Sequence, residues 1–244
     1  MKQVLTDVRL FAGGADLSGA SNKAELSAEF EEKDSTNYRS GGYKEVVAGL
    51  ASSSISGEGF WEAGDPSLVD DASWAMLGNR TAWTICPGDA VVGALAYTTH
   101  ALHSSYQFLG EVGDIAPWTA KVSGSWPVAR GQVAHPPGTA RTTTGTGTGV
   151  QLAAVPAGQR MYAALHVLSV SGTTPSITVR VESAPTNAFS SPTTRLTFTA
   201  ANARGGEILR TAPGAITDTW WRVAWTISGT TPSFLFAAAV GPAQ

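Results

Sequence analysis

Apolar and polar residues alternate strictly from Ala24 to Glu31, in the segment AELSAEFE. Alternation of period two places successive side chains on opposite faces of a half-buried strand. One face is expected to carry Ala24, Leu26, Ala28 and Phe30, and the other the acidic and serine residues between them. A helix is the competing interpretation, but its spacing of about 100° per residue would spread the acids around the axis. The segment is therefore predicted to be a strand.

A polar stretch follows, from Glu31 to Glu45, and contains the loop-forming sequences DSTN and GG. Residues of these types favour turns, through side-chain hydrogen bonds or a permissive backbone. Strand character resumes from Val46 to Phe60, where one face carries Ser52, Ser54, Ser56 and Glu58. The pattern predicts two strands joined by a long polar loop.

One helix is predicted, from Pro66 to Leu77. Asp65 is a suitable N-cap, Pro66 suits the first helical position, and Gly78 can end the helix in the left-handed conformation. Its apolar stripe consists of Leu68, Ala72 and Met76. The helix is expected to pack against the sheet.

Further strands are predicted at residues 82–85, 91–98, 104–109 and 118–128. Residues 132–149, QVAHPPGTARTTTGTGTG, have the composition of a linker, because adjacent prolines are stiff and alternating Thr and Gly are pliable. The chain is therefore divided into a domain of residues 1–131, a linker of residues 132–149 and a domain of residues 150–244.

The second domain contains the sequence SGTTPS twice, at residues 171–176 and 228–233. Each copy lies between two strand-like runs, which predicts two β-hairpins with similar turns and a small antiparallel sandwich. The fold class is thus mainly β, with one flanking helix and a C-terminal β-sandwich.

The distribution of charge also differs between the two predicted domains. Residues 1–130 carry 16 acidic and 9 basic residues, whereas residues 131–244 carry 3 and 7. The formal net charge of -3 gives no general attraction to nucleic acid. The N-terminus lacks the apolar run of a signal peptide and no stretch is long enough to span a bilayer, so a soluble protein without a membrane partner is expected.

Few residues suggest catalysis or metal binding. His100 and His103 are spaced H-x-x-H, but on a strand they point to opposite faces, and Cys86 is the only cysteine. No G-x-S-x-G sequence is present. We therefore expect no enzyme activity, no metal and no cofactor.

The first 130 or so residues resemble the major tail tube proteins of long-tailed, siphovirus-like bacteriophages. The resemblance rests on the order of the elements: an N-terminal strand (Val4–Phe11), a turn, the acidic alternating strand and a long polar loop. A strand ending in SISGEGFWE, a helix and the late segment GEVGDIAPWTAKVSGSWPVAR complete it. The second half resembles the β-sandwich domains that some tail proteins carry outside the tube.

The resemblance implies a subunit that assembles with itself into rings, commonly hexameric, which stack into a tube for DNA ejection. It also implies a location in the virion tail after assembly in the host cytoplasm. The implied partners are other tail proteins, such as the tape measure and terminator proteins, and genomic DNA that passes without sequence-specific binding. The candidate channel-facing residues are Glu25, Ser27, Glu29, Ser52, Ser54 and Ser56, and the candidate inter-ring residues are Asp34, Asn37, Tyr38, Arg39, Tyr43 and Lys44.

The alternative function is a phage decoration or adsorption protein that binds cell-surface carbohydrate through Trp220 and Trp225. Exposed tryptophans stack well against sugar rings. The competing and favoured interpretation is that Trp221, Val223 and Trp225 face a sandwich core while Trp220 lies at an edge.

Overall fold

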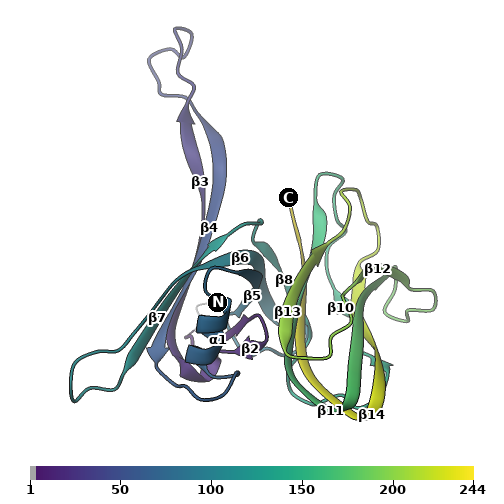
Figure 1. Ribbon diagram of the computed structural model, residues 1–244. Coiled ribbons are helices and arrows are strands. Elements are labelled where there is room, and N and C mark those ends of the chain that lie inside the picture. The colour runs from purple at the N-terminus through teal and green to yellow at the C-terminus, as the bar shows by residue number, and fades with distance from the viewer. Residues whose placement is uncertain (1–3) are drawn as a thin grey trace.

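The structure is a computed structural model that describes residues 4–244. It is built mainly from antiparallel strands, with one α-helix, α1 (Val69–Met76), in the described part (Figure 1). The predicted fold class, mainly β with one helix, is confirmed. The strands of the first half are β1 (Arg9–Ala12), β2 (Ala15–Asp16), β3 (Ser21–Asp34), β4 (Val46–Phe60), β5 (Arg80–Cys86), β6 (Leu95–Phe108), β7 (Pro117–Gly124) and β8 (Ala129–His135).

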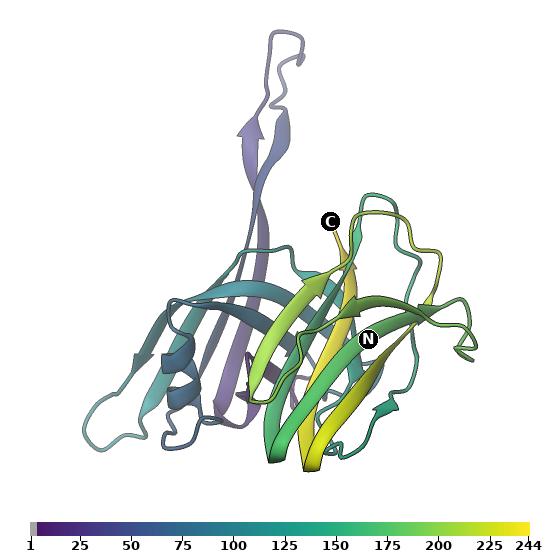
Figure 2. The ribbon, with the colours of Figure 1, turned by 45° about the vertical axis from the view of Figure 1, so that its right-hand side comes forward.

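Strands β3 and β4 form a long hairpin that rises away from the rest of the molecule (Figures 1 and 2). Strand β4 also pairs with β7, and β7 pairs with β6, so the base of the hairpin belongs to a sheet in the order β3-β4-β7-β6. The alternating segment is a strand, as predicted. Its apolar face, however, is covered only near the base: Leu26 is half-buried, whereas Ala28 is exposed and Phe30 is 63% exposed because the hairpin has left the body by then.

Helix α1 begins three residues later than the predicted Pro66. The Asp65 carboxylate accepts a hydrogen bond from the Ser67 backbone N–H, and the Asp65 carbonyl accepts one from the Leu68 N–H. These bonds form a separate turn, so the N-cap is Leu68 and it makes no side-chain capping bond. The prediction that Gly78 ends the helix in the left-handed conformation is confirmed, since Gly78 follows the helix with a φ of +77°.

The second half contains β9 (Gly145–Thr146), β10 (Val150–Gln151), β11 (Arg160–Ala184), β12 (Thr193–Thr197), β13 (Gly205–Arg210) and β14 (Trp220–Ala243). Strands β11 and β14 pair along nearly their whole length, from Arg160 with Ala243 to Ala184 with Trp220. The ribbon that they form folds over on itself (Figure 2). Its two halves enclose one core that includes Leu165, Val179, Trp225 and Phe236.

The two SGTTPS segments are not hairpin turns, which corrects the prediction. They face each other in the middle of the ribbon, with Ser171 opposite Ser233 and Ser176 opposite Ser228. Gly172 and Gly229 have φ values of +117° and +118°, and Thr174 and Thr231 both have φ near +47°. Both strands therefore bend at the same point with the same backbone conformation, and the ribbon turns its corner as a unit.

Strand β8 connects the two halves. It pairs with β6 on one side and with β14 on the other, so all the strands belong to one sheet. Residues 132–135, which the sequence assigns to a linker, form the end of this strand, and Val133, Ala134 and His135 are buried. Burial against both halves outweighs the loop-like composition of the segment.

A second contact joins the halves at the turn between β1 and β2. His166 is buried there, with Nδ1 2.9 Å from the Gly13 carbonyl oxygen and Nε2 2.8 Å from the Thr84 hydroxyl. A neutral imidazole satisfies both partners by donating from Nδ1 and accepting at Nε2. Beside it the backbones touch, since a Cβ on Gly206 would lie 2.6 Å from the Cα of Gly13.

Replacing Gly206 with alanine is expected to lower the free energy of unfolding by about 1–3 kcal/mol, because the added methyl group overlaps backbone that cannot move aside. Gly205→Ala is the matched control, since a Cβ there meets nothing within 4 Å. Urea unfolding of both variants measures the difference. Equal stability of the two variants would contradict the close contact.

Acidification is expected to destabilise the fold through two histidines. Burial lowers the pKa of both His166 and His135 to about 4, from an ordinary value of 6.5. The unfolded chain therefore binds more protons, and stability falls as the pH decreases from 6.5 to 4, by up to about 3 kcal/mol for each histidine. Urea unfolding at several pH values should show a shallower dependence in His166→Gln, and an unchanged dependence would refute this role.

Candidate assembly surface

The six candidate channel-facing residues lie together on one face of the sheet β3-β4-β7-β6. Glu25 lies opposite Ser56, Ser27 opposite Ser54, and Glu29 opposite Ser52. Residues directly opposite each other in an antiparallel pair project from the same face. The structure therefore brings the six residues onto one surface. The sequence alone indicates which residues share a face within each strand, but not how the two strands align.

The same face continues across β7 with residues that sequence analysis missed. Ser56 lies opposite Lys121, Glu58 opposite Thr119, and Ser54 opposite Ser123. Polar and apolar residues alternate in PWTAKVSG, but the alternation does not show which of them share a face with the serines of β4. The register of β4 with β7 shows it. We call the residues of this surface the polar face: Lys23, Glu25, Ser27, Glu29, Ser52, Ser54, Ser56, Glu58, Thr119, Lys121 and Ser123.

The polar face is weakly acidic, with the carboxylates of Glu25, Glu29 and Glu58 against two lysines. The Lys23 Nζ lies 3.0 Å from Glu25 and 3.3 Å from Glu58, and the hydrogen bond to Glu25 is the main cause of its raised pKa. The Ser27 hydroxyl donates to Glu29 at 2.9 Å. These contacts join the charged side chains to their neighbours at the surface, where Glu25 and Glu29 are exposed.

The opposite face of the sheet fixes this orientation by packing on the body. Ile55 and Val122 lie opposite each other and are buried, with Leu26 packed beside them. Trp118 is also buried, and its indole N–H donates to the Ala20 carbonyl at 2.9 Å. Turning the polar face inward would expose this core, so the face is held outward.

The sheet has free edges on both sides. Strand β3 pairs only with β4, and residues 104–108 of β6 pair only with β7 in the described chain. Free edges offer unpaired N–H and C=O groups that readily accept another strand. The polar face thus lies on a sheet that can be extended at either side.

The candidate inter-ring residues lie at the tip of the hairpin, far from the body (Figure 1). Tyr38 is fully exposed there. Backbone N–H groups of Thr36 and Arg39 donate to the side chains of Asp34 and Asn37, at 2.8 and 2.9 Å. Two of the six candidates therefore shape the tip, which is preorganised rather than extended chain.

The tryptophan pair does not form a carbohydrate site. Trp225 is only 4% exposed, its indole N–H donates to the Thr143 carbonyl at 2.9 Å, and its ring packs on Phe236 and His135. Trp221 is buried as well, and Trp220 is half-buried. The favoured interpretation, with Trp221 and Trp225 in the core, is confirmed, and the proposed contact through Trp225 is wrong because a sugar cannot reach it.

The histidines and the cysteine also serve packing. His103 is fully buried with its ring edge-on to Trp83, and His100 packs on Trp126. Burial raises the pKa of the Cys86 thiol to about 12, so the thiol stays protonated and unreactive. Within residues 4–244 no cluster of three potential metal ligands occurs. No described helix is both long and apolar enough to cross a membrane.

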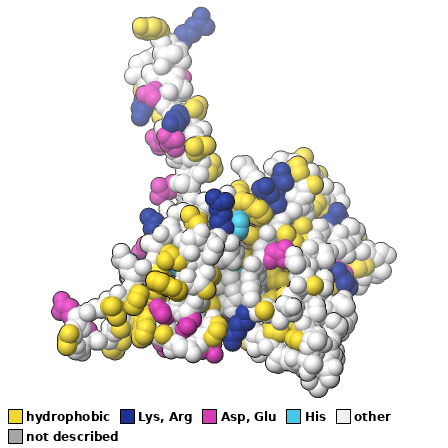
Figure 3. Space-filling view, in the orientation of Figure 1, with side chains coloured by type: hydrophobic (Ala, Val, Ile, Leu, Met, Phe, Trp, Pro, Cys, Tyr) yellow, Lys and Arg dark blue, Asp and Glu magenta, His cyan; other side chains and the backbone are white. Residues whose placement is uncertain are grey.

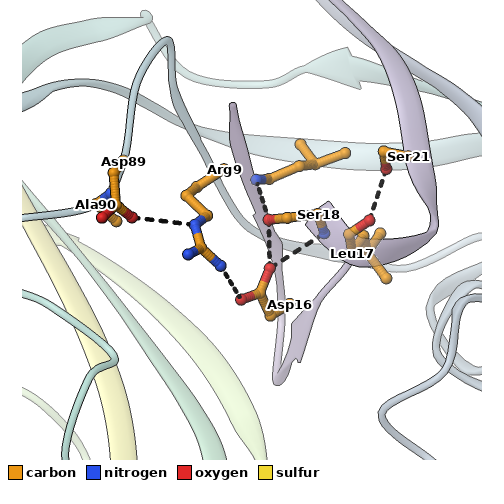
Figure 4. A network of polar contacts seen from close by, with 8 residues as sticks. Arg9, Asp16, Leu17, Ser18, Ser21, Asp89 and Ala90 are labelled. Atoms are coloured by element: carbon orange, nitrogen blue, oxygen red, sulfur yellow. Dashed lines mark hydrogen bonds and ion pairs between the residues drawn. The ribbon is translucent and has the colours of Figure 1, made fainter. Parts of the chain in front are cut away.

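A cavity of about 740 Å³ lies between the two halves. Arg9 reaches into it, with Nε 3.2 Å from Asp89 and Nη1 3.6 Å from Asp16 (Figure 4). Asp16 also accepts bonds from the backbone N–H and hydroxyl of Ser18, whose oxygen accepts one from the Leu10 N–H. These charges are engaged with one another and hold the turn between β1 and β2.

No protein-family model matches the chain, and no curated protein matches it in sequence. Among solved structures, it is similar to a chain of the tail of an empty gene transfer agent particle, refined with C6 symmetry. That match has a TM-score of 0.44 and 19% identity, over 52% of this chain and 98% of that chain. It is also similar to the SPP1 tail tube protein, with a TM-score of 0.39 and 13% identity, over 51% of this chain and 76% of that chain.

Over nearly its whole length the chain is similar to the SPP1 Dit protein, described as a paradigm of the hub adsorption apparatus in phages that infect Gram-positive bacteria. The TM-score is 0.35 and the identity 9%, over 98% of this chain and 100% of that chain. The first two of these structures are named as a particle tail and a tail tube.

Proposed function

We propose that this chain is a structural subunit of a phage-type tail that closes into a ring around a channel for DNA. The single observation that carries the proposal is the sheet β3-β4-β7-β6, which has one polar face and one face packed on the body. Its backbone is unpaired along β3 on one side and along residues 104–108 of β6 on the other. A sheet of this kind is completed when copies join edge to edge.

Edge-to-edge joining is consistent with the strand directions. Along the sheet each strand runs antiparallel to its neighbour, so β3 and β6 at the two edges run in opposite directions. Rotation about a ring axis preserves these directions, and β3 of one copy therefore meets β6 of the next in antiparallel orientation. Closure would pair both edges and remove the risk of uncontrolled strand addition.

The polar face would then line the channel. Every copy would add the carboxylates of Glu25, Glu29 and Glu58, which repel phosphate groups, and hydroxyls that bind no particular base. Such a lining favours passage of DNA over retention. In this arrangement the hairpin tip extends beyond the ring toward the next one, and the second half lies outside the channel.

Negative-stain electron microscopy of the concentrated protein is expected to show hollow rings or stacked rings. Replacing residues 36–43 with Asn-Gly should leave ring closure intact, because the hydrogen bonds of the tip stay within the hairpin. Tubes of this variant should be shorter. Monomers in the unaltered protein at high concentration would contradict edge-to-edge closure.

Reversing charge on the polar face is expected to make assembled protein retain DNA. Glu25→Lys combined with Glu29→Lys would replace repulsion by attraction in every copy, so double-stranded DNA should sediment with the assemblies at low salt and be released at high salt. Glu62→Lys is the control, an exposed acid outside the polar face. Equal DNA retention by both variants would place the polar face outside the channel.

A further inference from the structure

Two apolar surfaces are exposed in the chain. The first is the connection between β6 and β7, residues 109–116, which we call the β6–β7 loop. Its side chains point into solvent, with Val112 fully exposed and Ile115 73% exposed. Apolar and acidic side chains gather at this corner of the molecule, at the lower left of Figure 3. An exposed apolar loop of this kind is typical of a contact surface.

The second surface is a groove of about 400 Å³ between the hairpin and the end of β14. The apolar face of the hairpin forms one wall, and residues 126–128 and 242–243 form the other. The apolar side chains that line it are Ala28, Phe30, Ala51, Trp126, Pro127, Val128, Pro242 and Ala243. This groove explains the exposed half of the alternating strand: its apolar residues beyond Leu26 face an unfilled space.

The charges of the two surfaces are complementary. The loop carries Glu111 and Asp114 and no basic residue. The groove carries Arg130, and Arg210 stacks over its Trp126 at 4.5 Å. None of these four forms an ion pair within the described residues. The single acid of the groove, Glu29, is engaged by the Ser27 hydroxyl.

The two surfaces lie at different heights along the direction of the hairpin. The connection between β6 and β7 is at the low end, and the C-terminal end of β14, which lines the groove, lies higher, near the lower part of the rising hairpin (Figures 1 and 2). A loop and a groove of one chain therefore cannot meet, but those of two copies displaced along this direction can. Because the surfaces differ, each copy offers one of each, and the contact repeats without closing.

We infer that the β6–β7 loop of one copy docks into the groove of the next copy along the stack. The occupant of the groove is thus a second copy of this chain, held by apolar burial of Val112 and Ile115 and by pairing of acids with arginines. The inference rests on the proposed stacking of rings, and it adds to the hairpin tip a second axial contact, made by a separate loop.

Disulfide trapping tests the contact. Cys86, the only cysteine, is buried with a raised pKa and will not interfere. A chain with Ile115→Cys and Ala51→Cys should form an open-ended ladder of crosslinked species under mild oxidation. Crosslinking should be roughly tenfold or more above that of Ile115→Cys with Thr193→Cys, because docking raises the local thiol concentration. Mixing the two single variants should give covalent dimers alone.

The outcomes separate this inference from the proposed function. Rings or tubes in electron micrographs without crosslinking above the control would overturn the loop contact and leave ring closure standing. Crosslinked ladders without rings would support the loop contact and refute closure. Absence of both would overturn both.

Discussion

The arrangement of the whole molecule depends on the double pairing of β8. This short strand forms backbone hydrogen bonds with β6 on one side and with β14 on the other. It therefore makes one sheet of two halves that differ in charge and in topology. The contact of His166 with Gly13 and Thr84 fixes the halves at a second point. Two separate attachments prevent rotation, so the hairpin and the end of β14 keep the spacing that forms the groove.

Sequence patterns predict the structural features that depend only on residues close together in the chain. The alternation from Ala24 to Glu31 specified a strand and sorted its side chains onto two faces, because that information lies in the period alone. It could not show what covers the apolar face, since that depends on how far the hairpin extends beyond the body. The helix was found through its apolar spacing and Gly78, but its start was misplaced because Asp65 closes a turn of its own.

The remaining errors concern contacts between distant residues. The SGTTPS segments have turn composition, and only the pairing of β11 with β14 shows that both are bends in continuous strands. Likewise Trp225 could face sugar or core until the fold placed Phe236 and His135 around it. The ion pair of Arg9 with Asp89 spans 80 positions and leaves no trace in local pattern. For the candidate site, the sequence supplied the residues of β3 and β4, and the register added Lys121 and Ser123 from β7.

The shared corner in β11 and β14 has a mechanical consequence. The ribbon crosses from one layer of the sandwich to the other without a break in either strand, so the two layers stay covalently joined at this corner by both strands. A pull between the halves along β8 would load its hydrogen bonds with β14 together, in shear, rather than open them one after another. A particle built from such subunits would carry tension through its sheets, and its loops would be the parts that yield first.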